Sequence, residues 1–222
     1  MVRSEELEIL DSDRVAEDEV ARSYRELRQV HRWLGNTGAI LRLLRQATRS
    51  SHPPRRILDI GCGQGALLAE IRDRLCLDVI GFDMRPAPSN APVRILTGNA
   101  VTDPLPRADI AICVAMAHHL SEDELAELIR NVSRSADRFI LLDLVRHPVP
   151  LVLFRAFVAP FLCRINALDG QTSVRRAFTA PELRRIVDSA LAGIARPTTH
   201  LRHRVSPFWI RQIVDIQWQR NN

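Results

Sequence analysis

The sequence predicts an α/β fold built on a mostly parallel sheet with helices on both faces. From Arg55 onward, short apolar runs alternate with longer runs of helical periodicity, a pattern typical of parallel strands joined by crossover helices. The short runs are apolar at nearly every position, as expected for strands covered on both faces. A glycine-rich segment, Gly61 to Gly65, stands between the first strand and the first helix of this series.

The first 52 residues are expected to form a helical cap ahead of the sheet. Ser4 to Glu19 is acidic and is predicted to be helical. The basic stretch that follows has an apolar residue at every third or fourth position, which indicates an amphipathic helix. A second helix is expected after a turn at Gly35 to Gly38 and should end near Thr48. Ser50 to Pro54 then breaks the helical pattern, so a new element must follow.

Five strands are expected in the central part of the chain, because each apolar run there is short and alternates with a turn or a helical segment. A helix from Ala66 to Leu75 follows the first strand. The helix before the fifth strand has a visible start, since Ser121 and Glu124 have the spacing of a capping box, and it should end near Arg134. The expected strands are Arg56 to Ile60, Asp78 to Asp83, Val93 to Leu96, Asp109 to Ala115 and Phe139 to Val145.

After the fifth strand the chain is expected to leave the sheet and then to return. Residues 147–179 are apolar in their first part and predict a helical lid insertion. Thr179 restarts a helix, since a proline follows it in the first turn. Thr198 to Gln219 should supply two last strands, joined near Ser206-Pro207. We therefore expect one domain over residues 1–222, made of a cap (1–52), a ligand-binding core (53–146), a lid (147–179) and a C-terminal helix with strands (180–222).

The overall composition restricts the class of partner. All 31 basic residues are arginine and the formal net charge is +5, a bias typical of GC-rich bacterial genomes. Because the arginines are spread along the chain, a nucleic-acid partner is not favoured. No apolar run reaches the roughly 18 residues of a membrane span, and the N-terminus lacks the apolar core of a secretory signal, so a cytoplasmic protein is expected. The four cysteines are too widely spaced to suggest a zinc site or a disulfide framework. A homodimer is compatible with the sequence.

The segment Ile57 to Gly65 predicts a nucleotide-binding turn. It ends a strand and opens a helix, with glycines where the backbone must turn sharply and let a ligand approach closely. The spacing Gly61-x-Gly63-x-x-Ala66 alone fits a dinucleotide as well as S-adenosylmethionine. Asp59 favours the second ligand, because a carboxylate repels a pyrophosphate and attracts an ammonium or a sulfonium group. Asn99, after the third strand, offers an amide that can read the edge of an adenine.

These residues resemble the class I S-adenosylmethionine-dependent methyltransferases of small-molecule type, over about residues 55–145. The resemblance implies a Rossmann-like, doubly wound, mostly parallel seven-stranded sheet and S-adenosylmethionine as cofactor. It also implies that Leu58 to Gly65 contacts the methionine part and that Asp83 binds the ribose hydroxyls. The family usually has Asp-Ala where this chain has Asn99-Ala100. The expected cofactor-binding residues are Asp59, Gly61, Cys62, Gly63, Gly65, Asp83, Met84, Asn99, Ala100 and Ala115.

Structural roles are alternatives for some of these residues. Asp59 could cap the helix that follows it, Asp83 could simply end its strand, and Asn99 could be a plain turn residue, since Gly-Asn is common in turns. Cys62 is better interpreted as a packing residue than as a chemical group.

The loop after the fourth strand is expected to border the transferred methyl group. His119 and, next to it, His118 are the candidate catalytic residues, as a base or a substrate contact, because imidazole titrates near neutrality. One of them could instead pack and hydrogen-bond to hold the loop. The motif of nucleobase amino methyltransferases is missing here, and so is the Asp and Asn cluster of metal-dependent catechol methyltransferases. No metal is therefore expected.

The expected reaction is methyl transfer to an apolar small molecule. The lid and the N-terminal helices could enclose an apolar substrate, which favours a hydroxyl or carboxyl oxygen of an aromatic or polyketide-like compound. The lid could also be an ordinary core helix or a dimer contact. Residues 169–179 resemble bacterial methyltransferases of secondary metabolism, which is an analogy. Two other functions stay open: an RNA methyltransferase, and a non-catalytic relative that only binds the cofactor.

Overall fold

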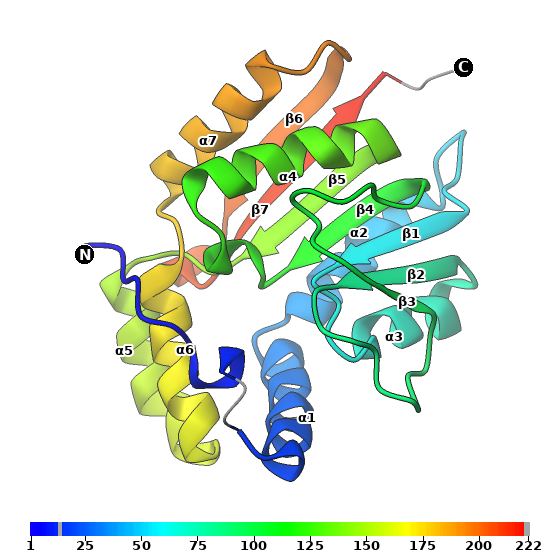
Figure 1. The fold of residues 1–222 in the computed structure, drawn as a ribbon. Coiled ribbons are helices and arrows are strands. Elements are labelled where there is room, and N and C mark those ends of the chain that lie inside the picture. Colours follow the sequence, from blue (N-terminus) through cyan, green and yellow to red (C-terminus); the bar gives the residue numbers. More distant parts are fainter. Residues whose placement is uncertain (13–14, 220–222) are drawn as a thin grey trace.

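The structure, a computed structural model, describes residues 1–12 and 15–219 and has three layers (Figure 1). A seven-stranded sheet in the order β3-β2-β1-β4-β5-β7-β6 lies between two layers of helices. Strands β1 to β5 run parallel, and β7 lies antiparallel to both β5 and β6. This sheet confirms the predicted fold class. The strands are β1 (Arg56–Ile60), β2 (Asp78–Asp83), β3 (Ile95–Thr97), β4 (Ala108–Val114), β5 (Ala136–Asp143), β6 (Thr198–Val205) and β7 (Gln212–Trp218).

The helices fall into those that cover the sheet and those that extend past its edge. The α-helices are α1 (Glu17–Trp33), α2 (Asn36–Ala47), α3 (Ala66–Leu75), α4 (Glu122–Ser135), α5 (Pro148–Phe157), α6 (Arg164–Arg176) and α7 (Ala180–Ala192). Short 3-10 turns are η1 (Ile9–Asp11), η2 (Ala117–His119), η3 (Ala159–Phe161) and η4 (Pro207–Trp209). Helices α1, α5 and α6 lie beyond the carboxyl ends of the parallel strands (Figure 1).

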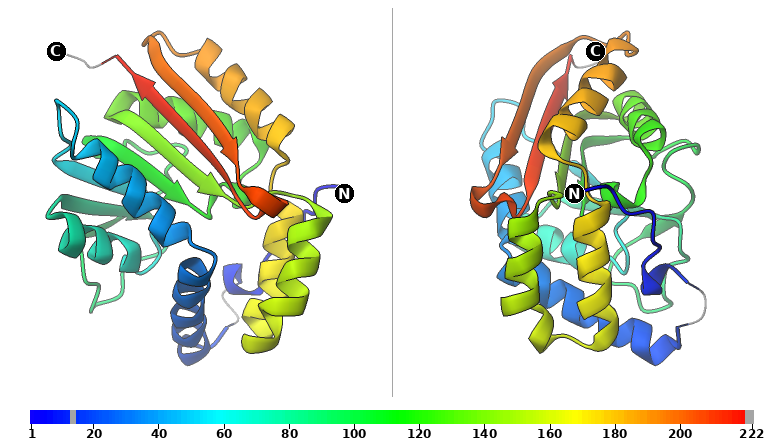
Figure 2. Two further views of the ribbon diagram at one scale, coloured as in Figure 1. Left: turned by 180° about the vertical axis from the view of Figure 1, so that it is seen from behind. Right: turned by 90° about the vertical axis from the view of Figure 1, so that its left-hand side faces the viewer.

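Two apolar cores, one on each face, hold the layers together. Helices α2 and α3 cover one face of the sheet, and α4 and α7 cover the other (Figure 2). In β1, Leu58 and Ile60 pack in the core beneath α4 and α7, whereas Ile57 packs in the core beneath α2 and α3. Successive side chains of a strand point to opposite faces. Strands with two covered faces therefore need apolar residues at nearly every position, which explains the runs in the sequence.

The strand order reverses between β1 and β4. From β1 the chain builds outward through β2 to β3, and it then returns to place β4 on the other side of β1. Helices on the two faces therefore separate at the carboxyl ends of these two strands, and open parallel sheets bind ligands at this crevice.

Several predicted boundaries are confirmed. Strands β1 and β2 and helix α3 begin and end at the predicted residues. Ser121 caps α4 in a full capping box with Glu124, and α4 ends at Ser135, one residue after the predicted end. Thr179 caps α7 in the same way. The final two strands are joined through Ser206 and η4.

Three predicted strands are shifted. The third begins at Ile95 and not at Val93, because its pairing with β2 starts at Gly81 opposite Ile95. The fourth ends one residue early, since Ala115 adopts a left-handed backbone with φ 52°. The fifth is longer at its start and ends at Asp143, because its pairing with β4 already begins at Ala136.

The helix predicted over Ser4 to Glu19 is wrong. Residues 1–8 are not helical, η1 is a single short turn and α1 begins only at Glu17; residues 13 and 14 lie outside the described residues. Beyond the local bonds of η1, the backbone of this segment bonds to α6, since Ile9 and Leu10 donate their N–H groups to Asp169. The predicted turn at Gly35 to Gly38 is also shorter, because only Gly35 is left-handed and α2 starts at once.

Residues 147–179 form α5, η3 and α6, so Asp169 and its neighbours lie within a helix. None of the helices among the described residues is both long and apolar enough to cross a bilayer. All four cysteines are free thiols, and Cys76 is exposed. A cytoplasmic location, the division of the domain into four parts and a homodimer stay predictions.

Candidate active site

A cavity of about 670 Å³ opens at the carboxyl ends of β1, β2 and β4, within the volume range of sites for small molecules. One wall comes from the glycine turn, the end of β2 and the loop after β3. The opposite wall comes from η1, η2 and α6, and α1 runs along the side between them. The cavity therefore joins two sets of residues that are far apart in the sequence.

The glycine turn needs its glycines. Gly61, Gly63 and Gly65 all have positive φ, at 71°, 53° and 76°, a region that side chains disfavour. A Cβ at Gly61 would lie 2.5 Å from Cγ of Met116 in the loop after β4. The turn thus passes close to the neighbouring strand, and Gly65 is the left-handed residue that precedes α3.

Asp83 ends β2 and faces the glycine turn. Its carboxylate accepts hydrogen bonds from Gly63 N at 2.7 Å and from Arg85 N at 2.9 Å. These bonds fix the side chain at the cavity wall, where its remaining lone pairs can accept from hydroxyl groups. Met84, the next residue, is 71% exposed and lines the rim of the cavity.

Asp59 lines the same cavity and is only 3% exposed. Burial raises the pKa of its carboxyl group well above the usual range, and the nearby Asp83 carboxylate raises it further. No hydrogen bond to this side chain occurs among the described residues. A buried carboxyl group without a partner is costly to ionise, and a cationic ligand would remove that cost.

The loop after β3 has a clear structural role. Oδ1 of Asn99 accepts from Val101 N at 2.9 Å, and Asn99 N donates to Asp103 at 2.8 Å. These are the bonds of a turn, so the turn alternative for Asn99 has direct geometric support. Asn99 and the buried Ala100 still line the cavity.

Two other predicted cofactor residues have structural roles as well. The side chain of Cys62 packs against Gly81, where a Cβ would lie 2.5 Å from its Sγ. Burial raises the pKa of this thiol, so it is not a nucleophile. Ala115 follows β4, and its N–H donates to Leu142 O at 2.8 Å. Both residues border the cavity.

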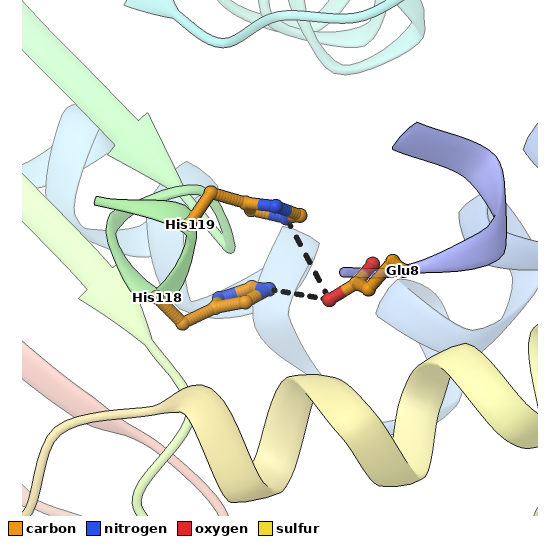
Figure 3. A group of neighbouring side chains, drawn as sticks. All are labelled: Glu8, His118 and His119. Atoms are coloured by element: carbon orange, nitrogen blue, oxygen red, sulfur yellow. Dashed lines mark ion pairs between the residues drawn. The ribbon is translucent and has the colours of Figure 1, made fainter. Parts of the chain in front are cut away.

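His118 is buried and bonded on two sides. The carboxylate of Asp143, at the end of β5, accepts from His118 N and lies 2.7 Å from Nδ1. On the other side of the ring, Nε2 lies 3.4 Å from Oε1 of Glu8 (Figure 3). Burial alone would lower the pKa of His118, but the Asp143 and Glu8 carboxylates raise it to about 10. These two carboxylates therefore favour the charged form of the ring.

His119 is more open than its neighbour. Its side chain is 27% exposed, and its Nδ1 lies 3.1 Å from Asp11 Oδ2. Its Nε2 faces Glu8 at 3.8 Å (Figure 3), and its ring centroid lies 4.3 Å from that of His118. Ser173 on α6 donates to Glu8 at 2.6 Å and thereby fixes the carboxylate between the two rings.

A methyltransferase domain family model matches residues 24–145, more than half of the 222-residue chain. The chain belongs to the methyltransferase family. The predicted resemblance to class I S-adenosylmethionine-dependent methyltransferases is therefore confirmed. No curated protein matches the sequence of this methyltransferase.

Solved structures share the fold of this methyltransferase at low identity. The plantazolicin methyltransferase BpumL, in complex with a monoazolic desmethylPZN analog and SAH, is 13% identical with a TM-score of 0.70, over 92% of this chain and 91% of its own. Magnesium protoporphyrin IX methyltransferase from Synechocystis PCC 6803, with bound SAH, is 15% identical (TM-score 0.55; 94% and 90% covered). A putative O-methyltransferase from Nostoc punctiforme is 14% identical (TM-score 0.57; 84% and 56% covered).

Several residues of this methyltransferase site were missed in the sequence. Asp143 could have been found, because a carboxylate at the end of the fifth strand must lie at the same edge as Asp59 and Asp83. No sequence pattern indicated that Glu8 and Asp11 belong to the site, since they stand in a segment without a regular spacing of apolar residues. Tyr24 on α1 also lines the cavity, near Gly63, and its place depends on how α1 crosses the sheet edge.

Proposed function

We propose that the chain binds S-adenosylmethionine against β1, β2 and β3 and methylates an oxygen of an apolar small molecule held beside His119. The observation that carries the donor assignment is Asp59, a buried carboxyl group without a partner at the wall of the cavity. It fits the ammonium or sulfonium of this cofactor and disfavours a pyrophosphate. The SAH in the two structures of the same fold supports this choice.

We call the wall formed by the glycine turn, the end of β2 and the loop after β3 the donor wall. Its residues have separate tasks in this proposal. The glycine turn lets the backbone approach the methionine part of the ligand. Asp83 receives the ribose hydroxyl groups, because a carboxylate accepts two such bonds at once. Asn99 and Ala100 border the adenine. Bound there, S-adenosylmethionine supplies an electrophilic methyl group on a sulfonium.

We call the opposite wall, formed by η1, η2 and α6 with the residues packed against them, the acceptor wall. Its side chains favour an apolar compound. Its apolar side chains include Leu120, Leu144, Phe154, Leu162 and Val174. Gly170 on α6 leaves the space that the ring of Phe154 occupies, since a Cβ there would collide with the ring. This packing joins α5 to α6, and residues 147–179 thus form one part of the acceptor wall.

His119 is the proposed group that accepts the proton of the acceptor hydroxyl, because it is the more open of the two histidines. His118 has a positioning role, since both of its ring nitrogens face carboxylates. Methyl transfer itself needs alignment of the oxygen with the methyl carbon and exclusion of water, to which the apolar side chains of the cavity contribute. General-base catalysis adds a factor of roughly 10²–10⁴.

Calorimetry and a labelled-methyl assay test the proposal. The purified chain is expected to bind S-adenosylmethionine and not NAD. It should transfer the labelled methyl group to members of a panel of phenols, enols and carboxylic acids. His119→Ala should lower turnover without changing cofactor affinity, whereas His200→Ala, a change at an exposed histidine on β6, should alter neither. Binding of NAD instead of S-adenosylmethionine would overturn the donor assignment, and methylation of RNA alone would overturn the acceptor class.

A further inference from the structure

Three side chains of the acceptor wall converge on one point: Glu8, His118 and His119 (Figure 3). One ligand atom from each lies within 4.8 Å of the other two. The two Nε2 atoms lie 3.4 Å and 3.8 Å from the same oxygen, Oε1 of Glu8. Among the side chains that the structure describes, no other group of His, Cys, Asp and Glu converges in this way.

The two histidine rings have the same orientation toward their partners. A carboxylate lies at Nδ1 of each ring, Asp143 at 2.7 Å for His118 and Asp11 at 3.1 Å for His119. Binding of a metal requires that Nε2 of His118 release the proton that faces Glu8, and a proton kept on each Nδ1 then leaves the Nε2 lone pairs for the ion. Histidines that bind a metal are usually oriented in this way, by a carboxylate or carbonyl on the other ring nitrogen.

The spacing of the three ligand atoms suits a single ion. Nitrogen and oxygen ligands of Zn²⁺ stand about 2.1 Å from the metal, so two of them at a tetrahedral angle are about 3.4 Å apart. The separation of His118 Nε2 from Glu8 Oε1 is 3.4 Å, and that of His119 Nε2 is 3.8 Å. The more exposed ring of His119 needs a shift of only a few tenths of an ångström.

The surroundings of the cluster favour a cation and leave one side open. Three carboxylates, Glu8, Asp11 and Asp143, contact the two imidazoles. The guanidinium of Arg176 pairs with Asp11 at 3.6 Å and offsets one of these charges. His118 and Glu8 are buried, His119 is partly exposed, and all three line the cavity. An ion bound here would therefore face the cavity.

We propose that Glu8, His118 and His119 bind one divalent first-row transition ion, Zn²⁺ or a close relative, with an open coordination position toward the cavity. The catalytic role of this ion rests on the proposed function. The acceptor hydroxyl binds at the open position and releases its proton to water. Its oxygen then forms a bond to the methyl carbon as the carbon–sulfur bond breaks, which leaves a neutral thioether. His119 then serves as a ligand in place of a base.

Metal binding is tested on the full chain, without an affinity tag, after treatment with a chelator. Calorimetry with ZnCl₂ should give one tight site per chain. Substitution with Co²⁺ should give visible absorption bands of the strength typical of a four-coordinate site. A chain that binds no Zn²⁺ and gives no Co²⁺ bands would overturn the inference.

Variants at the cluster identify the ligands. Glu8→Gln and His119→Ala should each weaken Zn²⁺ binding by more than about 100-fold and remove the Co²⁺ bands. Asp143→Asn, which changes an orienting partner, should weaken binding by roughly 10- to 100-fold. His200→Ala is the matched control and should bind as the unchanged chain does. Equal binding by the Glu8→Gln, His119→Ala and His200→Ala variants would place the ion elsewhere.

The activity of the stripped chain separates this inference from the proposed function. If the ion takes part, removal of the metal abolishes methyl transfer while S-adenosylmethionine still binds, and Zn²⁺ restores turnover. Full turnover without metal would overturn the catalytic role of the ion and leave His119 as the base. Failure to bind S-adenosylmethionine would overturn the proposed function and leave the Zn²⁺ titration unaffected.

Discussion

The two walls of the cavity are built in different ways. The donor wall takes its residues from a short part of the chain, Asp59 to Ala100, and each stands at or just after the carboxyl end of a parallel strand. The acceptor wall joins Glu8, His118 and Asp143 to helix α6. The first wall follows from the order of the strands alone. The second exists only after distant segments have packed together.

The largest expected effect is a loss of folding stability, and it should be greater for a variant in the acceptor wall than for one in the donor wall. Asp143→Ala removes the acceptor of two buried N–H groups of His118, those of its backbone N and its Nδ1, and of the part-buried N–H of Leu144. The free energy of unfolding should fall by about 3–5 kcal/mol, because a buried charged partner is left uncompensated. Urea titration measures this loss. Asp83→Ala, in the donor wall, is the comparison and should cost less, and equal losses would break the contrast between the walls.

The next effect concerns the affinity for the donor. Asp83→Ala should weaken the binding of S-adenosylmethionine by about 1.5–3 kcal/mol, since it removes a charged acceptor of hydrogen bonds. Calorimetry gives the change, and the Michaelis constant of the acceptor should stay the same. Asp78→Ala, an exposed change at the other end of β2, should bind as before. If the affinity of the Asp83 variant does not change, the ribose assignment is wrong.

A smaller effect should appear at the N-terminal segment. Asp169→Ala removes the acceptor for the N–H groups of Ile9 and Leu10, at 2.7 and 3.0 Å. Opening of residues 1–12 should become roughly tenfold more frequent, as expected for the loss of about 1.5 kcal/mol. The rate of limited proteolysis in this segment measures it. Asp188→Ala on the exposed side of α7 is the control, and equal cleavage of both variants would contradict the docking role of Asp169.

The smallest expected effect is the release of at most one proton when the donor binds. The raised pKa of Asp59 means that the folded chain without ligand holds a proton there more tightly than the unfolded chain does. The tighter binding of this proton stabilises the folded chain. The stabilisation is fully present below the ordinary carboxyl pKa and is lost as the pH rises through the pKa of Asp59 in the folded chain. A bound cation favours the carboxylate, so affinity for the donor should increase with pH in that range.

Calorimetry in two buffers of different ionisation enthalpy counts the released proton. Asp59→Asn cannot titrate and should release none, although its affinity is expected to be lower. Proton release that is the same in the Asp59→Asn variant would assign the proton to another group.

The donor wall shows what could be predicted from the sequence. Strand β1, helix α3 and the turn between them follow from local residue patterns, and the three glycines have the backbone angles that their spacing implied. Asn99 was ambiguous, because an amide after a strand suits both a turn and a ligand contact. Its bond to Val101 shows the turn.

The acceptor wall shows why the rest could not be predicted. Residues 4–19 are rich in acidic residues that suit a helix, yet the backbone N–H groups of Ile9 and Leu10 find a better acceptor in Asp169. Local propensity is a weak guide where such a tertiary contact competes with it. The position of Glu8 depends on that contact, so neither the metal ligands nor the partners of the histidines could be read from spacing.

The contact between Glu8 and α6 also sets an order of events during synthesis. The residues that pair around the glycine turn and Asp83 all precede the end of β4 in the chain. Ile9 must wait for Asp169, which follows it by 160 positions. Residues 1–12 can therefore reach these contacts only after α6 has been made, whereas the donor wall needs no residue beyond β4.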